Sequence, residues 1–411
     1  IWRNLGSFNA TLILTNKMKK RLRLTDEEAQ YLGLNVAETK DQKNAKYTLN
    51  AEQLEKIYIY RGYDLGLINE CIEKGISINK VSDYWHKSEH FSLRVREEKK
   101  DESIKIGDVF DSIIERHLKH FTPIKRTQPS KKSNKALKVT ITDSHVGMNP
   151  NPGNNSLFQY EYNSDIYNQS IAKVYNSILK EHATFGTFDL LLLDDLGDLA
   201  DGWNGYTTRG GHNLPQNMSN AEVFEVCVDA YVNLIKSLVE ANVANKIILR
   251  CICNDNHSGD FALIINKGIQ KIINLMYSKD IVEVDILERF IEHRTYGDHC
   301  FVLTHGKDKE QMKGGLPIVL NDKAIRLIND YIEHYEINSK FIHVEKGDLH
   351  QIGYQRTKKF DYRNFMSFAP PSSWIQHNFG DSYSGYSIQV IPKFNNEISH
   401  TDYFIEYDKR K

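Results

Sequence analysis

The sequence predicts an α/β fold for residues 136–411, preceded by a mostly helical domain over residues 1–121. After residue 136, strand-like apolar runs alternate with stretches of helical length, which is typical of α/β proteins. The apolar runs cover 137–141, 188–193, 246–252, 300–303 and 341–344, and the helical stretches lie near 165–183, 219–240, 260–277 and 321–336. Residues 383–407 return to alternating strand patterns.

The first domain contains signals for helices. Thr25 is followed three positions later by Glu28, which is a capping-box pattern at a helix start. A helix ending at Gly75, a tight turn, and a second helix from near Ser77 to Trp85 resemble a helix-turn-helix. The second helix could enter a nucleic-acid groove. A plain helical hairpin explains the same pattern equally well.

Residues 122–135 lack apolar periodicity and are rich in Pro, Ser and Lys, so we predict a linker and a domain boundary there. Residues 1–135 carry 26 Lys and Arg against 19 Asp and Glu, whereas the remainder carries 27 against 35. A basic front part suits a polyanionic partner, and an acidic back part suits a carboxylate-rich cation site. A moderate excess of charge is also common on ordinary solvated surfaces.

Composition excludes two classes of protein. No run approaches the roughly 18 apolar residues of a membrane span, so we expect a cytoplasmic protein without a membrane partner. Five cysteines form too sparse a set for a disulfide framework. Cys251 and Cys253 fit one face of a buried strand better than a zinc site, because no second pair completes the pattern.

Metal-capable residues follow all five apolar runs. The clusters are Asp143-Ser144-His145, Gly197-Asp198-Leu199-Ala200-Asp201, Asn254-Asp255-Asn256-His257, Thr304-His305-Gly306 and Gly347-Asp348-Leu349-His350. Sites in open α/β sheets form at the carboxyl ends of strands, so we expect these clusters to converge. One such cluster alone is usually a turn, but five in succession favour a shared site. Carboxylate, imidazole and amide ligands suit two divalent ions, and hydrolysis of a phosphate ester is the reaction that such a pair fits best.

The order of these motifs resembles the calcineurin-like metallophosphoesterase superfamily over residues 137 to about 395, and the SbcD-like and phage-encoded branches more than the protein phosphatases. The resemblance implies a four-layer α/β/β/α sandwich and hydrolase activity. It implies one metal held by Asp143, His145 and His350, a bridging Asp198, and a second metal held by Asn256, His305 and Asp348. His257 matches the family histidine that contacts the phosphate and assists the leaving group, a role that suits the imidazole pKa.

The sequence departs from the family pattern at three places. Asp348 replaces an imidazole ligand, which favours Mn²⁺ or Mg²⁺ over Zn²⁺ and leaves Fe²⁺ open. Ser258 replaces the acidic residue that follows the histidine, and Asp255 or Asp260 could take over its steadying role. Gly202-Trp203 follows Asp201 where protein phosphatases have Arg-Gly, which argues against a phosphoprotein substrate.

A loop rich in Gly, Asn and Thr after Asp201 is a candidate for substrate contacts. Arg209 could clamp a non-reacting phosphate, and Trp203 or Tyr206 could stack on a base. His212 could share in acid–base work, although a solvated loop position explains it more simply.

These observations favour a nuclease that hydrolyses phosphodiester bonds of DNA or RNA with two divalent cations, Mn²⁺ above all. One alternative is a phosphoesterase acting on nucleotides or other small molecules, with the first domain serving homo-oligomerisation. Another is a non-catalytic scaffold with a residual metal site. A phage-encoded protein acting in a host cytoplasm is compatible with the resemblance.

Overall fold

The structure, a computed structural model, describes residues 20–24, 26–34, 46–60, 83–87, 92–96, 103–119, 121–122, 133–152, 156–310 and 315–408. The chain divides into two compact units, Ile1–Lys100 and Asp101–Lys411. No helix within the described ranges has the length and apolar composition needed to cross a lipid bilayer.

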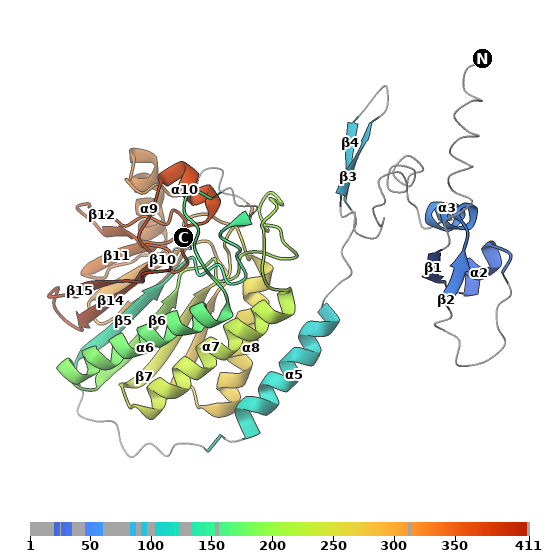
Figure 1. Cartoon of the computed structure of the whole chain (residues 1–411). Coiled ribbons are helices and arrows are strands. Elements are labelled where there is room, and N and C mark those ends of the chain that lie inside the picture. Colours follow the sequence, from blue (N-terminus) through green and yellow to red (C-terminus); the bar gives the residue numbers. More distant parts are fainter. Residues whose placement is uncertain are drawn as a thin grey trace. The chain divides into compact units, whose positions relative to one another are not determined.

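The first unit contains two small antiparallel strand pairs and two helices in its described parts (Figure 1). β1 (Lys20–Arg23) pairs with β2 (Lys46–Leu49), and β3 (Asp83–Lys87) pairs with β4 (Ser92–Arg96). The helices are α2 (Asp26–Tyr31) and α3 (Ala51–Tyr60). A small core joins them, made of the buried residues Leu24, Ala29, Leu49, Leu54, Ile57 and Tyr58.

The second helix of the expected helix-turn-helix differs from the structure at its C-terminal end. Asp83–Lys87 forms strand β3, not the end of a helix. Adjacent aromatic residues favour a strand, and pairing with β4 outweighs the local helical pattern. The rest of the expected motif, residues 67–82, lies outside the described residues. The described part of the first unit is therefore a mixture of short strands and helices.

The larger sheet of the second unit has six strands in the order β15-β14-β5-β6-β7-β8. The strands are β5 (Lys135–Ile141), β6 (Phe188–Asp195), β7 (Ala244–Ile252), β8 (Val282–Leu287), β14 (Gly385–Pro392) and β15 (Ser399–Phe404). β5 to β8 are mutually parallel, and β14 joins β5 antiparallel. The carboxyl ends of β5, β6 and β7 therefore lie at the same edge of this sheet.

The smaller sheet has five strands in the order β12-β13-β11-β10-β9. They are β9 (Glu292–Tyr296), β10 (His299–Thr304), β11 (Phe341–Lys346), β12 (Gly353–Arg356) and β13 (Asp361–Asn364). β10, β11 and β13 are parallel, and the two outer strands are antiparallel to their neighbours. The carboxyl ends of β10 and β11 thus supply a second set of loops at one edge.

Three apolar cores stack the second unit into four layers. Helices α6 (Ser164–Phe185), α7 (Asn220–Glu240) and α8 (Asp260–Met276) pack on the larger sheet, as Figure 1 shows. A second core, including Leu192, Phe301 and Ile391, lies between the two sheets. A third joins the smaller sheet to α9 (Asp322–His334), and a short α10 (Ser373–Phe379) follows β13. The predicted α/β/β/α sandwich is confirmed, and the five strand-like runs and four helical stretches predicted after residue 136 each match a strand or helix to within two residues at either end.

Helix α5 (Ser103–Lys119) belongs to the second unit, not to the predicted first domain. Ile113 on this helix is fully buried in the core of α7 and α8. The Phe110 ring meets the Phe224 ring of α7 edge-on, with centroids 5.9 Å apart. Arg116 adds ion pairs to α7 at Glu225 and at Asp229. The contacts therefore place the boundary near residue 100, before the expected linker at 122–135, most of which lies outside the described residues.

The cysteines of the second unit are structural. Cys251 and Cys253 are both buried in the core beneath the helices, while Ile252 between them points into the core between the sheets. This alternation is the expected geometry of a buried strand. Burial raises the pKa of the Cys253 thiol, so the group stays a neutral thiol.

Candidate metal centre

Five loops bring the predicted ligands together at one end of the sandwich. Each loop follows a parallel strand, namely β5, β6, β7, β10 or β11. The predicted ligands that are buried at these loops are Asp143, His145, Asp198, Asn256, His305 and His350. Polar side chains are seldom so deeply buried unless they have partners. Because all six are buried, their polar atoms need hydrogen-bond partners or a bound ion at this site.

The backbone at these loops adopts an unusual conformation. Among the described residues, nine other than glycine have positive φ, and five of the nine are predicted ligands. They are Asp143 (53°), His145 (42°), Asp198 (53°), Asp348 (76°) and His350 (52°). Such residues cost on the order of 1–3 kcal/mol each and persist where the surrounding structure imposes them, often at functional sites.

Hydrogen bonds between two of the loops impose this conformation. Asp143 N donates to Gly197 O at 3.0 Å, and His145 N donates to Asp198 O at 2.9 Å. Beyond them, Ser367 Oγ donates to Asp143 O at 2.9 Å. The loops after β5 and β6 are thereby locked together. The three side chains that they carry are consequently aimed at a common point.

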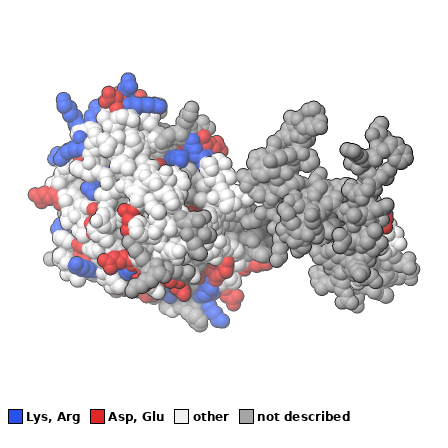
Figure 2. All heavy atoms as spheres, turned by 45° about the horizontal axis from the view of Figure 1, so that its top comes forward, with Lys and Arg blue, Asp and Glu red and all other residues white. Residues whose placement is uncertain are grey.

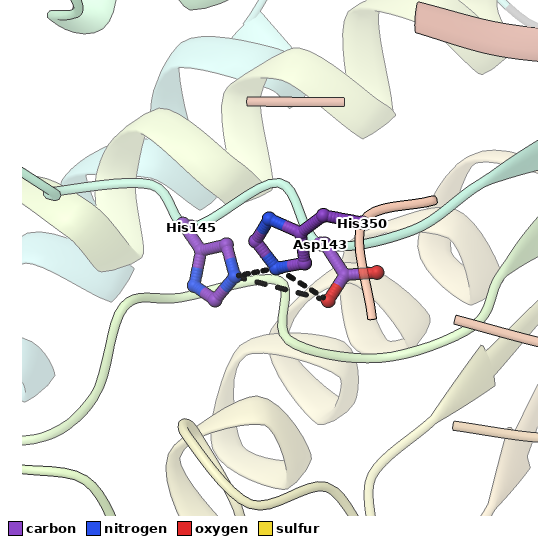
Figure 3. Close-up of side chains that lie close together, drawn as sticks. All are labelled: Asp143, His145 and His350. Carbon is purple, nitrogen blue, oxygen red and sulfur yellow. Dashed lines mark hydrogen bonds and ion pairs between the residues drawn. The ribbon is translucent and has the colours of Figure 1, made fainter. Parts of the chain in front are cut away.

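The first group of converging atoms comes from Asp143, His145 and His350, whose side chains point toward one another in Figure 3. His350 Nε2 lies 3.2 Å from Asp143 Oδ1 and 3.2 Å from His145 Nε2. His145 Nε2 lies 3.8 Å from Asp143 Oδ1. Atoms bound at about 2.0–2.2 Å to one metal ion lie roughly 3–3.6 Å from each other, so this spacing fits a shared cation.

The second group joins Asp143, Asp198 and His305. His305 Nε2 lies 3.1 Å from Asp198 Oδ2, which in turn lies 3.9 Å from His145 Nε2. Asp198 therefore faces both groups, as a bridging ligand would. Its other oxygen, Oδ1, accepts a hydrogen bond from His257 N at 3.1 Å.

Contacts behind two of the histidines fix which ring nitrogen faces the centre. His305 Nδ1 lies 2.8 Å from Leu196 O, and a carbonyl can only accept a hydrogen bond. The Nδ1 atom must therefore carry a proton, which leaves Nε2 to face Asp198 Oδ2. His145 Nδ1 likewise lies 3.1 Å from Asp201 Oδ1, so its Nε2 faces His350. Carbonyl and carboxylate partners of this kind orient metal-binding histidines.

A divalent cation fits this donor set. Asp143 Oδ1, Asn256 Oδ1 and His305 Nε2 are buried and make no hydrogen bond within the described structure. Leaving such atoms unsatisfied costs about 1–3 kcal/mol each. Burial lowers the pKa of His305, but the Asp198 carboxylate raises it well above its usual range. A positive charge therefore belongs between these two residues, and a metal cation supplies one.

His257 stands at the edge of the centre, with its side chain 22% exposed. Its Nε2 lies 4.0 Å from Asp198 Oδ2, and its Nδ1 lies 3.5 Å from Asp201 Oδ1. Burial lowers the pKa of His257, but the carboxylates of Asp198 and Asp201 outweigh burial and raise it to about 9. His257 is therefore placed to hold a proton near the converging atoms.

Asp201 is a functional candidate that sequence reasoning left out of the ligand set. Its Oδ1 contacts both His145 and His257, so one carboxylate orients a predicted ligand and the predicted catalytic residue together. The signal was present in the sequence as the second Asp of Gly197-Asp198-Leu199-Ala200-Asp201. Spacing alone did not reveal that this Asp would point at the histidines.

Of the two residues expected to steady the loop at Ser258, Asp255 is the one whose carboxylate contacts it. Its Oδ1 accepts hydrogen bonds from Ser258 N at 2.7 Å and Gly259 N at 2.9 Å. Burial raises the pKa of Asp255 to about 7, with the Asp198 charge adding to the effect. Asp260, the other candidate, is exposed and pairs with Lys309 at 2.7 Å.

Asp348 lies beside the centre, but its carboxylate is in neither group of converging atoms. Its backbone N donates to Asp143 Oδ2 at 3.2 Å, and its charge contributes to the raised pKa of His305. Asn256 agrees better with its predicted role as a metal ligand, because its side-chain oxygen is buried and makes no hydrogen bond within the described structure. The ligand roles of both residues stay predictions.

The loop after Asp201 attaches directly to the centre. Thr208 N donates to His257 O at 2.9 Å, and Arg209 N donates to Asn256 O at 3.0 Å. The predicted substrate residues are differently placed. Arg209 Nη1 pairs with Asp308 Oδ1 at 2.9 Å, and the Trp203 ring packs edge-on against Phe261 at 4.8 Å. His212 is exposed and contributes no atom to the two groups.

No family model and no curated protein matches this chain. Solved structures with a similar fold include wild-type Vps29 complexed with zinc from Entamoeba histolytica (10% identity, 65% of this chain and 98% of that one, TM-score 0.28). Others are a novel archaeal phosphodiesterase (10%, 66% and 99%, 0.30) and GAP50 of the inner membrane complex of Plasmodium (9%, 67% and 90%, 0.34). Similarity at this level assigns no chemistry to this chain, whose own residues have to supply it.

Proposed function

We propose that this chain is a metal-dependent phosphoesterase of the calcineurin-like metallophosphoesterase superfamily, and that it hydrolyses phosphodiester bonds in nucleic acid. One observation above all supports the proposal. Carboxylate oxygens and imidazole nitrogens from loops of both sheets converge at 3.1–3.9 Å, buried and without sufficient partners among themselves. Such an arrangement is costly in a protein that binds no cation there.

The donor set divides naturally between two ions. Asp143, His145 and His350 would hold one, and His305 with Asn256 would hold the other. Asp198 would serve both, because it faces both groups. Two divalent cations would supply Lewis-acid stabilisation of a phosphoryl group and activation of a water nucleophile, and Mn²⁺ is one ion that a mixed set of oxygen and imidazole ligands accepts.

The chain's own residues supply proton transfer and orientation. His257 would supply the proton that the leaving oxygen needs, because burial lowers the pKa of its imidazole but nearby carboxylates, Asp201 among them, raise it. Asp201 positions this imidazole through Nδ1 and leaves Nε2 directed at the centre. Backbone bonds from Thr208 and Arg209 to the His257 loop keep that imidazole in place.

The nucleic-acid substrate is supported by the basic composition of residues 1–135, which suits a polyanion. A second candidate function, hydrolysis of a small phosphate ester, is favoured by the second unit. In this unit Arg209 forms an ion pair with Asp308, and the Trp203 ring packs against Phe261. Neither side chain is therefore placed to contact a nucleic-acid strand. On the face drawn in Figure 2, its basic and acidic side chains are interspersed, and no broad basic surface is visible.

The deciding experiment measures cleavage of single-stranded DNA, double-stranded DNA, RNA and bis(p-nitrophenyl) phosphate with added Mn²⁺. Asp198→Asn removes the charge that faces both groups, and Asp260→Asn is the matched control at an exposed acidic position. Polymer cleavage that Asp198→Asn abolishes and Asp260→Asn retains would establish the nuclease. Cleavage of the small diester alone would favour the second candidate. Inactivity on every substrate with metal bound would refute catalysis.

A further inference from the structure

A separate cavity of about 220 Å³ opens between the two sheets, away from the metal centre. Strands β11, β12 and β13 of the smaller sheet line one side, and β14 and β15 of the larger sheet line the other. None of the predicted metal ligands, nor His257, lines it. Polar side chains dominate its wall, unlike the apolar core that fills the rest of the space between the sheets.

Arg363 is the main cationic group of this wall whose charge lacks a partner. Within the described residues its guanidinium forms no ion pair, and its single hydrogen-bond contact joins Nη1 to His400 Nε2 at 2.7 Å. The guanidinium is held by stacking, 5.0 Å from the centre of the Tyr354 ring and 6.0 Å from that of Phe365. Its position is thus set by aromatic contacts, which leave its N–H donors available.

The contact between Arg363 and His400 satisfies at most one of the guanidinium donors. His400 Nε2 also lies 2.7 Å from Asp402 Oδ1, and a carboxylate can only accept. The same nitrogen holds either a proton or a lone pair, so it cannot both accept from Arg363 and donate to Asp402. With either tautomer, most N–H donors of Arg363 have no partner within the described residues. Asp402 is already engaged by His400 and by Ser387 Oγ at 2.6 Å.

Both walls present acceptors. His299 Nε2 lies 2.9 Å from Asn395 O and must donate to it, so His299 Nδ1 accepts from His343 Nε2 at 3.0 Å. That chain leaves His343 Nδ1 with a lone pair at the cavity. Burial lowers the pKa of His343 to about 3, which keeps the ring neutral. Gln389 Oε1 is also buried at the cavity and makes no hydrogen bond.

We propose that this cavity binds a small oxyanion, a carboxylate or phosphate, through Arg363, and that the ligand also donates a hydrogen bond to Gln389 or His343. A guanidinium that forms no ion pair and keeps most of its donors available is the group that pairs with a planar carboxylate or a phosphate. The cavity is smaller than the roughly 300–1,000 Å³ of pockets for drug-sized ligands, so the ligand is compact. The proposal is independent of the phosphoesterase function.

The test titrates the full chain, stripped of metal with a chelator, by calorimetry with inorganic phosphate and, separately, with malate. Arg363→Gln should weaken binding of the preferred anion roughly ten- to one-hundred-fold, which is the loss of a charge-assisted bond. Arg356→Gln is the matched control, since Arg356 lines the same cavity but already pairs with Asp361 at 3.2 Å. It should weaken binding by less than about threefold. The two titrations separate a phosphate ligand from a carboxylate.

The proposal is overturned if neither anion binds saturably up to about 20 mM, or if both variants weaken binding equally. Circular dichroism will show whether Arg363→Gln folds. A crystal of the unmodified chain soaked in selenate gives a readout that needs no variant. An anomalous peak beside the Arg363 guanidinium supports the site, and its absence overturns it.

Discussion

Replacing Asp201 by Asn tests the proton-donor role of His257 while leaving all the predicted ligands in place. The Asp201 carboxylate lies 3.5 Å from His257 Nδ1 and helps to raise the His257 pKa to about 9. When Asp198 binds cations its charge is neutralised, so Asp201 becomes the main carboxylate that supports the imidazolium. The amide of Asn keeps the size of the side chain and removes the charge.

The direction and size of the effect of Asp201→Asn on turnover follow from the pKa of His257. A raised pKa keeps His257 protonated at low pH, and turnover that needs this proton falls as the pH rises through that pKa. In Asp201→Asn the pKa moves toward the ordinary value of about 6.5, so the alkaline limb moves to lower pH. Loss of one neighbouring carboxylate lowers the pKa of such a group by about one unit, which cuts the protonated fraction about tenfold at a pH above the pKa. We therefore expect roughly tenfold slower turnover at a pH above the pKa and a much smaller titration effect at pH 6.

The assay is the kcat for bis(p-nitrophenyl) phosphate between about pH 5.5 and 9.5 with saturating Mn²⁺, alongside the bound metal measured by mass spectrometry. Any loss that is equal at all pH values reports looser orientation of His145, which shares the Asp201 carboxylate. Asp260→Asn should reproduce the profile of the parent chain, because Asp260 is exposed. Superimposable profiles for Asp201→Asn and the parent chain would refute the assigned role of Asp201.

Three further outcomes follow from the structure. Lys138→Met should lower the free energy of unfolding by about 3–5 kcal/mol in urea titrations, because it strips buried Glu345 of its ion pair at 2.6 Å. Lys246→Met, which breaks a half-exposed pair, should cost under about 1 kcal/mol, and equal effects would contradict this reasoning. Ile113→Ala should lower the free energy of unfolding by about 2–5 kcal/mol in the same titration, because α5 is part of the second unit's core. An unchanged free energy would show that α5 does not belong to this core. Asp198→Ala should lose both metal ions in metal analysis, and retention of either one would show that it does not bridge.

Regular patterns predicted the α/β fold and the position of the centre, whereas the four-layer sandwich was implied by the resemblance to a known superfamily. Apolar runs predicted β5, β6, β7, β10 and β11, and parallel strands place their carboxyl ends together. Convergence of Asp143, Asp198 and His305 is the structural consequence of that order. The direction in which each side chain points could not be predicted from the sequence. Asp348 follows β11 as predicted, yet its carboxylate stands apart from the converging atoms, because direction depends on the local loop conformation.

The sequence patterns did not predict short strands or contacts between distant parts of the chain. β1 has the sequence Lys-Arg-Leu-Arg, in which a single apolar residue gives no periodicity to detect. α5 lies in a region that was expected to be mostly helical, but its partner surface on α7 and α8 lies more than 100 residues away in the chain. Its assignment to a domain therefore needed the tertiary contacts. The contacts of Arg209 and Trp203 could not be predicted either, because their partners are distant in the sequence.

The strand order has a consequence for synthesis on the ribosome. β5 is a central strand, yet its neighbour β14 begins at Gly385, which is 244 positions beyond Ile141 at the end of β5. At about 5–20 residues per second, one edge of β5 waits roughly 12–50 s for its partner. An unpaired apolar strand is a template for aggregation during that interval. A nascent chain released before Pro392 would therefore aggregate, and would not give a smaller working protein.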